Sequence, residues 1–251
     1  MESASLAAAV TITSACRLAG LTWVGVRALR LARRTRGAPE LLLGVSLLSF
    51  STLGVPLLAL SGYGGAHVSD ANVPLLAGAL GLLDFGTACF AAFVAHVFRR
   101  GSRLGSAALA GAVLALAAHL VLATRGVAGA PPELSPIAAI GRAELILSFV
   151  MSATFAWGAA ESFIYWRRLR LQHALGLADS AAVRRMLWFA LACGSQLAMM
   201  GFTLLASLRG TNPLADPLPA LGIALTSLGM GAAFALALGS PSSVPKAAPG
   251  R

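Results

Sequence analysis

Two ionisable residues of opposite charge, Arg17 and Asp84, stand inside long apolar stretches of the sequence. An ionised side chain in the hydrocarbon layer of a membrane is costly unless it is paired or hydrated, so each is a candidate for function. At about 1.5 Å of rise per helical residue, both come roughly 15 Å deep, near the middle of a bilayer. We therefore predict an ion pair between them, which either fixes helix packing or lines a polar site.

Uncharged polar residues in two later apolar stretches could line the same site. The candidates for contact with a solute are Ser195, Gln196 and Thr226. Ser and Thr hydroxyls in membrane helices often bond to carbonyl groups of their own helix, so a packing role is the competing interpretation.

A second set of ionisable residues, His119, Arg142 and Glu144, is expected nearer the outer membrane surface. Arg142 and Glu144 are about 200° apart around a helix and therefore cannot pair with each other. His119 and Glu144 are candidates for a proton-responsive contact, because imidazole exchanges protons near neutral pH. An ordinary hydrogen bond without proton traffic is the alternative.

The composition identifies the surroundings of these residues. Of the 251 residues, 57% are hydrophobic and 11% are charged, whereas about 25% of an average soluble domain is charged. This excludes a soluble protein. The net charge of +10 would suggest nucleic acid as the partner of a soluble protein, but here the basic residues gather between the apolar stretches. We expect a lipid bilayer as partner and no nucleic acid.

The apolar stretches predict an all-α polytopic membrane protein with seven transmembrane helices, since a helix needs about 20 residues to cross a bilayer. The transmembrane domain is expected over residues 1–238. A tail over residues 239–251, rich in Ser, Pro, Ala and Gly, is expected to be disordered in the cytoplasm. The predicted helices cover residues 6–35, 39–60, 73–98, 104–124, 137–174, 181–208 and 220–238.

The basic residues predict the orientation. Fifteen Lys and Arg residues fall in the gaps and tail on one side and two on the other, which places the N-terminus outside and the C-terminus in the cytoplasm. Residues 165–173 contain no helix breaker, so the fifth helix should project into the cytoplasm. The residues expected to contact a cytoplasmic protein or lipid headgroups are Arg167, Arg168, Arg170, Arg184 and Arg185.

Several kinds of chemistry lack the residues that they require. The last predicted helix has no lysine for a retinal Schiff base, and His96 and His119 are expected at opposite membrane surfaces, which argues against haem or zinc ligation. Sequence motifs of common catalytic sites are absent. We therefore expect no enzyme activity, no metal and no cofactor, and we interpret Cys16, Cys89 and Cys193 as buried apolar residues.

Two stretches carry a resemblance to known proteins. Residues 33–44, RRTRGAPELLLG, and residues 165–179, YWRRLRLQHALGLAD, resemble a group of uncharacterised bacterial seven-helix integral membrane proteins, and the likeness extends over most of the chain. The resemblance implies no known activity. It implies a multi-pass protein of the bacterial inner membrane, which the preference for Arg over Lys also fits.

Two functions from different classes follow as predictions. The first is a small-solute transporter with a polar site at Arg17 and Asp84, and a weak similarity between the first and last three helices is compatible with a repeated transporter architecture. The second is a membrane sensor that signals through the basic residues 167–185. A structural subunit of a membrane complex is a third possibility, and the oligomeric state is left open.

Overall fold

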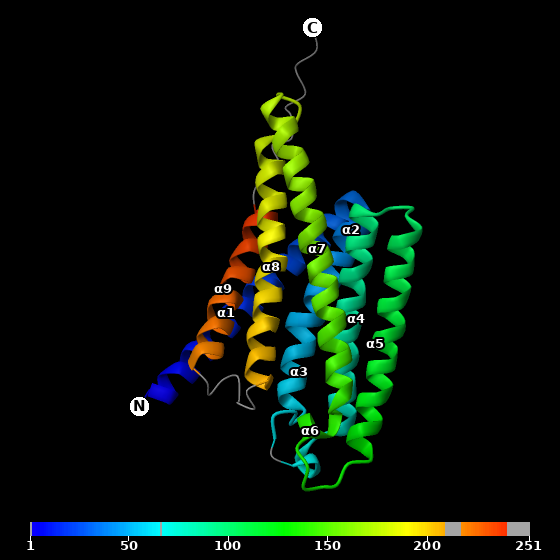
Figure 1. Ribbon diagram of the computed structural model, residues 1–251, viewed down its shortest axis with the longest axis vertical. Coiled ribbons are helices and arrows are strands. Elements are labelled where there is room, and N and C mark those ends of the chain that lie inside the picture. Colours follow the sequence, from blue (N-terminus) through cyan, green and yellow to red (C-terminus); the bar gives the residue numbers. More distant parts are fainter. Residues whose placement is uncertain (1, 66, 209–216, 240–251) are drawn as a thin grey trace.

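The computed structural model describes residues 2–65, 67–208 and 217–239, which form helices joined by short connections, with no strand among them (Figure 1). Residues 240–251, which include most of the predicted tail, lie outside the described residues. The elements are α1 (Glu2–Thr35), α2 (Ala38–Leu47), η1 (Leu48–Gly54), α3 (Val55–Leu60), η2 (Val68–Asp70), α4 (Val73–Phe98), α5 (Arg103–Ala128), α6 (Pro136–Ile140), α7 (Arg142–Ala174), α8 (Ser180–Leu208) and α9 (Pro217–Gly239).

Local sequence signals set the helix starts. The side chains of Asn72, Ser102 and Ser135 each accept a hydrogen bond from a backbone N–H in the first turn of α4, α5 and α6, which satisfies a donor that has no partner within the helix. Helix α7 ends at Ala174, and the chain turns away at Gly176, whose φ of 73° suits glycine. The observed bounds lie within about one turn of those predicted from the sequence.

Two helices that the sequence predicted to be continuous are interrupted. Between α2 and α3 the backbone forms the π-helical segment η1, just before Pro56. Proline has no N–H and crowds the carbonyl four residues earlier. The backbone hydrogen bonds of the helix are therefore rearranged there, and its turn is wider. The helix predicted over residues 137–174 breaks at Gly141, where φ is 50°, and this break separates α6 from α7.

Six of these helical segments are long and apolar enough to cross a membrane, which is compatible with a multi-pass integral membrane protein. They are Ala38–Leu60, Val73–Phe98, Arg103–Ala128, Ala143–Ala174, Ser180–Leu205 and Pro217–Leu238. Large apolar side chains on their outer faces, such as Leu114 and Phe149, are exposed, as expected where lipid is the surrounding solvent.

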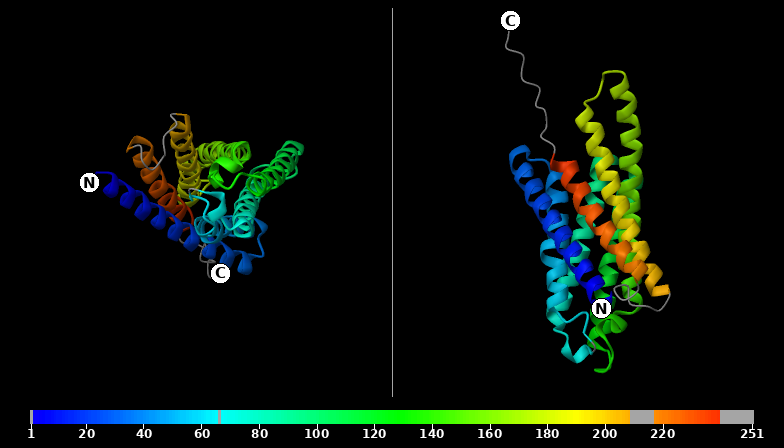
Figure 2. Two further views of the ribbon diagram at one scale, coloured as in Figure 1. Left: turned by 90° about the horizontal axis from the view of Figure 1, so that it is seen from below. Right: turned by 90° about the vertical axis from the view of Figure 1, so that its left-hand side faces the viewer.

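The helices form a bundle in which chain neighbours are mostly neighbours in space. The first helix, α1, packs against α9 on one side and α2 on the other, while α4 packs against α2, α5 and α7. Seen along the bundle, α8 and α9 lie far from α5 (Figure 2). We call the end where α7 and α8 join the hairpin end, and the opposite end, where α6 lies, the α6 end (Figure 1).

The centre of the bundle is an aromatic cluster. The rings of Phe90 and Phe155 stack with centroids 4.6 Å apart, and Phe189 packs against Phe93 and Phe234 at 5.4 and 5.6 Å. These five side chains come from α4, α7, α8 and α9, so they join the two halves of the bundle around one buried core.

Candidate functional site

Asp84 on α4 pairs with His119 on α5 inside the membrane-spanning bundle. The Nδ1 atom of His119 lies 2.8 Å from Oδ2 of Asp84 and 2.9 Å from Oδ1. The imidazole is fully buried, and the carboxylate is nearly so. An ionised carboxylate only accepts hydrogen bonds, so Nδ1 of His119 carries the hydrogen when Asp84 is charged.

Glu144 and Tyr63 extend this pair towards the α6 end. Glu144, near the start of α7, interacts electrostatically with His119 and Asp84, and its carboxylate interacts with the hydroxyl of Tyr63. Burial, followed by the nearby Glu144 carboxylate, raises the pKa of Tyr63, which lies in the connection after α3. Tyr63 is therefore a permanent donor at physiological pH. We call Tyr63, Asp84, His119 and Glu144 the acid–histidine group.

Two atoms of the acid–histidine group have unused hydrogen-bonding capacity. Nε2 of His119 and Oε2 of Glu144 are both buried, and neither has a hydrogen-bond partner among the described residues. Buried polar atoms normally have a partner, which can be a water molecule or a ligand. The group can therefore accept or deliver a proton on one side while the Asp84–His119 contact holds the imidazole in place.

The predicted ion pair between Arg17 and Asp84 is wrong. Asp84 is occupied by His119, because α4 and α5 form a hairpin with a short turn, whereas α1 packs on α9 and α2. Glu144 lies near enough to His119 to interact with it electrostatically, but the direct contact of His119 is with Asp84, so the proton-responsive contact of His119 with Glu144 stays a prediction. The side chain of Arg142 lies outside the described residues.

A second polar group surrounds Arg17. Its Nη1 atom donates to the sulfur of Met199 at 2.9 Å, and the hydroxyl of Ser227 donates to the same sulfur at 3.5 Å. Gln196 is fully buried and lies about one helical turn before Met199 on α8, on the same helix face. We call Arg17, Gln196, Met199 and Ser227 the Arg17 group.

The Arg17 group lacks the partners that its charge and amide require. Arg17 is 9% exposed, and its Nε has no hydrogen-bond partner among the described residues. Both Nε2 and Oε1 of Gln196 are likewise without one. A thioether is a weak acceptor, so the guanidinium is a buried cation with little compensation. The arrangement offers donors and one acceptor to an anionic or polar molecule.

Thr226 and Ser195, which were also predicted to contact a solute, are not among the residues of the Arg17 group. The hydroxyl of Thr226 donates to the carbonyl of Gly222 in its own helix at 2.7 Å, which is the packing role foreseen as the alternative. Ser195 on α8 faces α9 near Gly229. Ser227, next to Thr226, provides the hydroxyl of the Arg17 group instead, because it lies on the buried face of α9.

A cavity of about 300 Å³ opens near the hairpin end among α1, α2, α4, α8 and α9. Its charged lining residues are Arg27, Glu40 and Arg185, and Phe93 and Phe189 belong to its apolar lining. We call it the basic cavity. Of the predicted cytoplasmic contact residues, Arg185 alone lines it.

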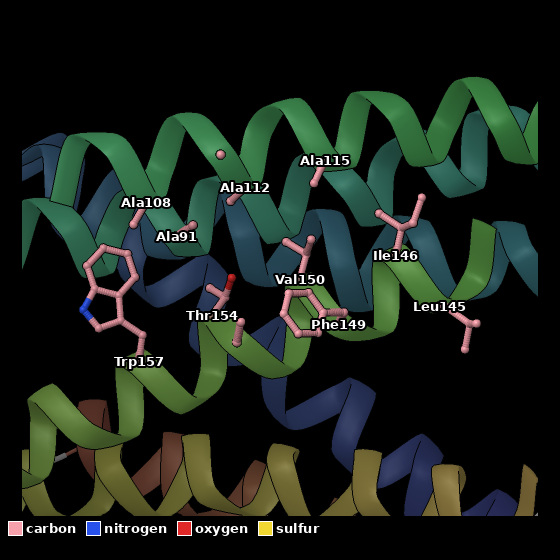
Figure 3. A pocket seen from close by; sticks show the side chains of 12 residues that line it. Ala91, Ala108, Ala112, Ala115, Leu145, Ile146, Phe149, Val150, Thr154 and Trp157 are labelled. Carbon is pink, nitrogen blue, oxygen red and sulfur yellow. The ribbon is translucent and has the colours of Figure 1, made fainter. Parts of the chain in front are cut away.

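A larger apolar groove of about 570 Å³ lies between α5 and α7. Figure 3 shows the small side chains of Ala108, Ala112 and Ala115 on α5 facing Phe149 and Trp157 on α7. No charged residue lines it, so the groove offers an apolar surface and no chemistry.

The remaining basic residues lie at the hairpin end. Arg167, Arg168 and Arg170 on α7 and Arg184 on α8 are exposed, and the guanidinium of Arg170 lies 5.7 Å above the ring of Trp166. They form a solvated basic surface where α7 and α8 extend beyond the other helices (Figure 1).

Comparisons with known proteins assign neither a family nor a function to the chain. No protein-family model matches the chain, and neither a curated protein nor a solved structure matches it at a significant level. Among the described residues, no group of three or more His, Cys, Asp or Glu side chains could hold a metal ion.

Proposed function

We propose that the chain is a small-solute transporter of the bacterial inner membrane, with α1 as a seventh membrane-crossing helix. The observation that carries the proposal is the Arg17 group. A guanidinium and an amide are buried in the bundle with donors and acceptors that the described residues leave unused. Such groups are costly in a membrane unless a solute or water completes them, and ion and substrate pathways are where membrane proteins place them.

The distribution of arginine supports an orientation with the hairpin end in the cytoplasm. The α1–α2, α4–α5 and α7–α8 connections all lie at that end (Figure 1), and the arginines at positions 27–36, 99–103 and 167–185 flank them. Basic residues remain on the cytoplasmic side during insertion. This orientation places the N-terminus outside, as predicted from the sequence.

The acid–histidine group supports coupling of transport to protons. His119 can pass a proton between Nε2 and the neighbouring Glu144 while Asp84 orients the ring through Nδ1. Histidine exchanges protons near neutral pH. In the proposal, protonation of this group and occupancy of the Arg17 group favour different packings of the α4–α5 pair against α7.

The test is a transport measurement on the purified full chain in proteoliposomes. Sugars, amino acids, nucleobases and organic acids are applied to membranes on a solid support, and charge movement is recorded between pH 5 and pH 8. We expect at least one solute to evoke a current in the wild type that is lost in Gln196→Leu and changes its pH dependence in His119→Gln. Glu133→Gln, in the exposed connection after α5, is the matched control. A panel without any solute-evoked current would contradict transport.

The α7–α8 hairpin favours a membrane sensor as the second candidate. The hairpin reaches beyond the other helices (Figure 1). It also carries exposed arginines, more than orientation requires, which could bind a cytoplasmic protein. Crosslinking from position 171 in living cells distinguishes the two. A single crosslinked protein partner, lost when Arg167, Arg168 and Arg170 are replaced by Gln, would favour the sensor.

A further inference from the structure

We infer that the Arg17 group binds a small carboxylate that also carries a hydroxyl group, and that such hydroxy acids are the solute class of the proposed transporter. The role in transport rests on the proposed function, whereas the binding is tested by itself. Three buried atoms of the group, Nε of Arg17 and both Nε2 and Oε1 of Gln196, have no hydrogen-bond partner among the described residues. The chemical types of these atoms define the ligand.

The side chain of Arg17 lies between α8 and α9. Its backbone packs against α9 at Gly231, where an added Cβ atom would come 3.4 Å from Cα of Arg17. From there the side chain reaches the sulfur of Met199 on α8, to which Ser227 also donates. Ser227 is one helical turn before Gly231, so the guanidinium occupies the level of this turn.

Gln196 lies at the same level of the bundle. Its neighbour Ser195 packs against α9 at Gly229, where an added Cβ atom would come 3.3 Å from Oγ of Ser195. Gly229 stands between Ser227 and Gly231 on α9. The amide of Gln196, which is fully buried, is therefore within about one helical turn of the guanidinium in depth.

The helices around Arg17 carry no acid that balances its charge. Within the described residues, Arg17 takes part in no salt bridge. The sequences of α1, α8 and α9 contain one acid, Glu2, which stands fifteen residues, or about 22 Å of helix, before Arg17. Glu40 lines the basic cavity near the hairpin end, and Asp84 contacts His119. A guanidinium stays charged at every physiological pH, so an anion from outside the chain is what neutralises it.

A carboxylate with a hydroxyl group on the neighbouring carbon satisfies the three free atoms together. The carboxylate accepts from Nε of Arg17 and from Nε2 of Gln196, and charge-assisted bonds of this kind are the strong ones. The hydroxyl group donates to Oε1 of Gln196. A plain carboxylate leaves Oε1 buried without a donor, and a neutral hydroxy amide leaves the guanidinium without an anion, so each loses part of the binding free energy.

The apolar side chains beside the Arg17 group favour a ligand of few atoms. Leu21 on α1 and both Met230 and Phe234 on α9 follow the group towards the hairpin end, and each is 2% exposed or less. Phe234 packs against Phe189 of α8 with ring centroids 5.6 Å apart. This packed layer borders the group on one side, so glycolate, the smallest hydroxy carboxylate, is the probe.

The experiment measures thermal unfolding of the purified full chain at pH 7 with sodium glycolate, sodium acetate, sodium chloride or the neutral glycolamide, at equal ionic strength. Glycolate should raise the unfolding midpoint, because a ligand of the folded state stabilises it, and the dependence on concentration gives Kd. We expect acetate, chloride and glycolamide each to bind at least about tenfold more weakly than glycolate.

Variants assign the binding to its residues. Arg17→Gln and Gln196→Leu should each weaken glycolate binding about tenfold or more, because each removes a buried contact. Arg17→Lys keeps the charge and should retain part of the affinity. Arg30→Gln and Gln172→Leu, at exposed positions of α1 and α7, are the matched controls and should bind glycolate as the wild type does.

Four outcomes would overturn the inference. These are no shift of the midpoint with glycolate, glycolamide that binds as tightly as glycolate, acetate or chloride that binds as tightly as glycolate, and a glycolate affinity that is unchanged in both Arg17→Gln and Gln196→Leu. If one variant fails to fold, the comparison of glycolate with acetate and glycolamide on the wild type still decides.

A flux measurement separates this inference from the proposed function. Glycolate that binds with the expected dependence on Arg17 and Gln196 but does not cross proteoliposomes would retain the hydroxy acid site and remove transport. Flux of a neutral solute without any glycolate binding would retain transport and overturn the hydroxy acid site.

Discussion

The acid–histidine group and the Arg17 group are both buried in the helical bundle, but among the described residues only the first contains a pair of oppositely charged groups in direct contact. Asp84 and His119 come from the two helices of one hairpin and meet at 2.8 Å. Arg17 and Gln196 come from α1 and α8, and within the described residues the guanidinium of Arg17 contacts a thioether and no carboxylate. Asp84 therefore has its partner within the chain, although Nε2 of His119 and Oε2 of Glu144 have none, whereas Arg17 has only a weak acceptor.

This difference assigns different roles to the two groups. A carboxylate and an imidazole can both lose their charge by moving a proton, so their pair can change state without a solute. A guanidinium cannot do so, and its charge must be balanced by an anion or by solvent. We therefore associate the acid–histidine group with protons and the Arg17 group with solute.

The largest expected effect comes from breaking the pair of Asp84 with His119. His119→Leu leaves Asp84 and Glu144 as buried carboxylates without the imidazole, and we expect the free energy of unfolding to fall by about 3–5 kcal/mol. Replacing both Asp84 and His119 by leucine should restore much of it, because an apolar pair replaces the charged pair. Unfolding in mixed detergent micelles measures both.

A second double-mutant cycle checks which partner Asp84 has. The effects of Arg17→Gln and Asp84→Asn should add within about 0.5 kcal/mol, since residues without a shared contact are independent. Coupling between Arg17 and Asp84 as strong as that between His119 and Asp84 would contradict the comparison of the two groups.

The Arg17 group should respond in the opposite direction. Arg17→Met removes buried donors that lack strong acceptors, so in the absence of solute we expect the free energy of unfolding to rise by about 1–3 kcal/mol. Arg30→Met, at an exposed position of α1, should change it by less than about 0.5 kcal/mol. A loss of stability in Arg17→Met would show that the guanidinium has a strong partner.

Tyr63 provides a smaller effect with a defined pH dependence. Its pKa is raised by burial and by Glu144, so the folded state favours the protonated phenol. The stabilisation is present below the unfolded pKa of about 10 and is lost as pH rises through the folded value. Tyr63→Phe should cost about 1 kcal/mol at pH 7.

Absorbance at alkaline pH tests the same residue directly. The chain has two tyrosines, so the phenolate signal of Tyr63 is the difference between wild type and Tyr63→Phe. We expect that difference to be absent near pH 10 and to develop only when the protein unfolds. A phenolate signal from Tyr63 near pH 10 in the folded protein would contradict its burial beside Glu144.

Sequence reasoning located the helices but not their neighbours. Hydropathy, capping residues and glycine or proline define each helix locally, so the observed bounds agree with the predicted ones to about one turn. The sequence also predicts similar depths in the membrane for Arg17 and Asp84, and these depths stay a prediction. Depth alone, however, does not show which helices touch, and α1 packs against α9 through Gly20 and Gly231, a closure of the bundle that no local pattern predicts.

One missed contact did have a signal in the sequence. In a helical hairpin, residues at equal distances from the turn lie side by side, and Asp84 and His119 are nearly equidistant from the turn at residues 99–102. This spacing favours His119 over Arg17 as the partner of Asp84. The contact of Tyr63 with Glu144 and the basic cavity depend on segments far apart in the chain, so they required the structure.

The smallest expected effect comes from an ion pair that is partly exposed. Arg99, just after α4, contacts Glu161 on α7 at 2.6 Å, and the indole of Trp157 donates to the same carboxylate oxygen at 3.3 Å. The arginine is 44% exposed, so water screens the attraction. Arg99→Gln should cost about 0.2–1 kcal/mol.

Salt separates this exposed pair from the buried one. Raising NaCl from about 0.05 to 1 M shortens the screening length from over 10 Å to about 3 Å, so the cost of Arg99→Gln should shrink towards zero. The coupling between Asp84 and His119 should stay the same, because no salt reaches buried atoms. If salt weakened both couplings equally, the acid–histidine group would be open to water, and the burial that sets its Asp84–His119 pair apart from the exposed Arg99–Glu161 pair would no longer hold.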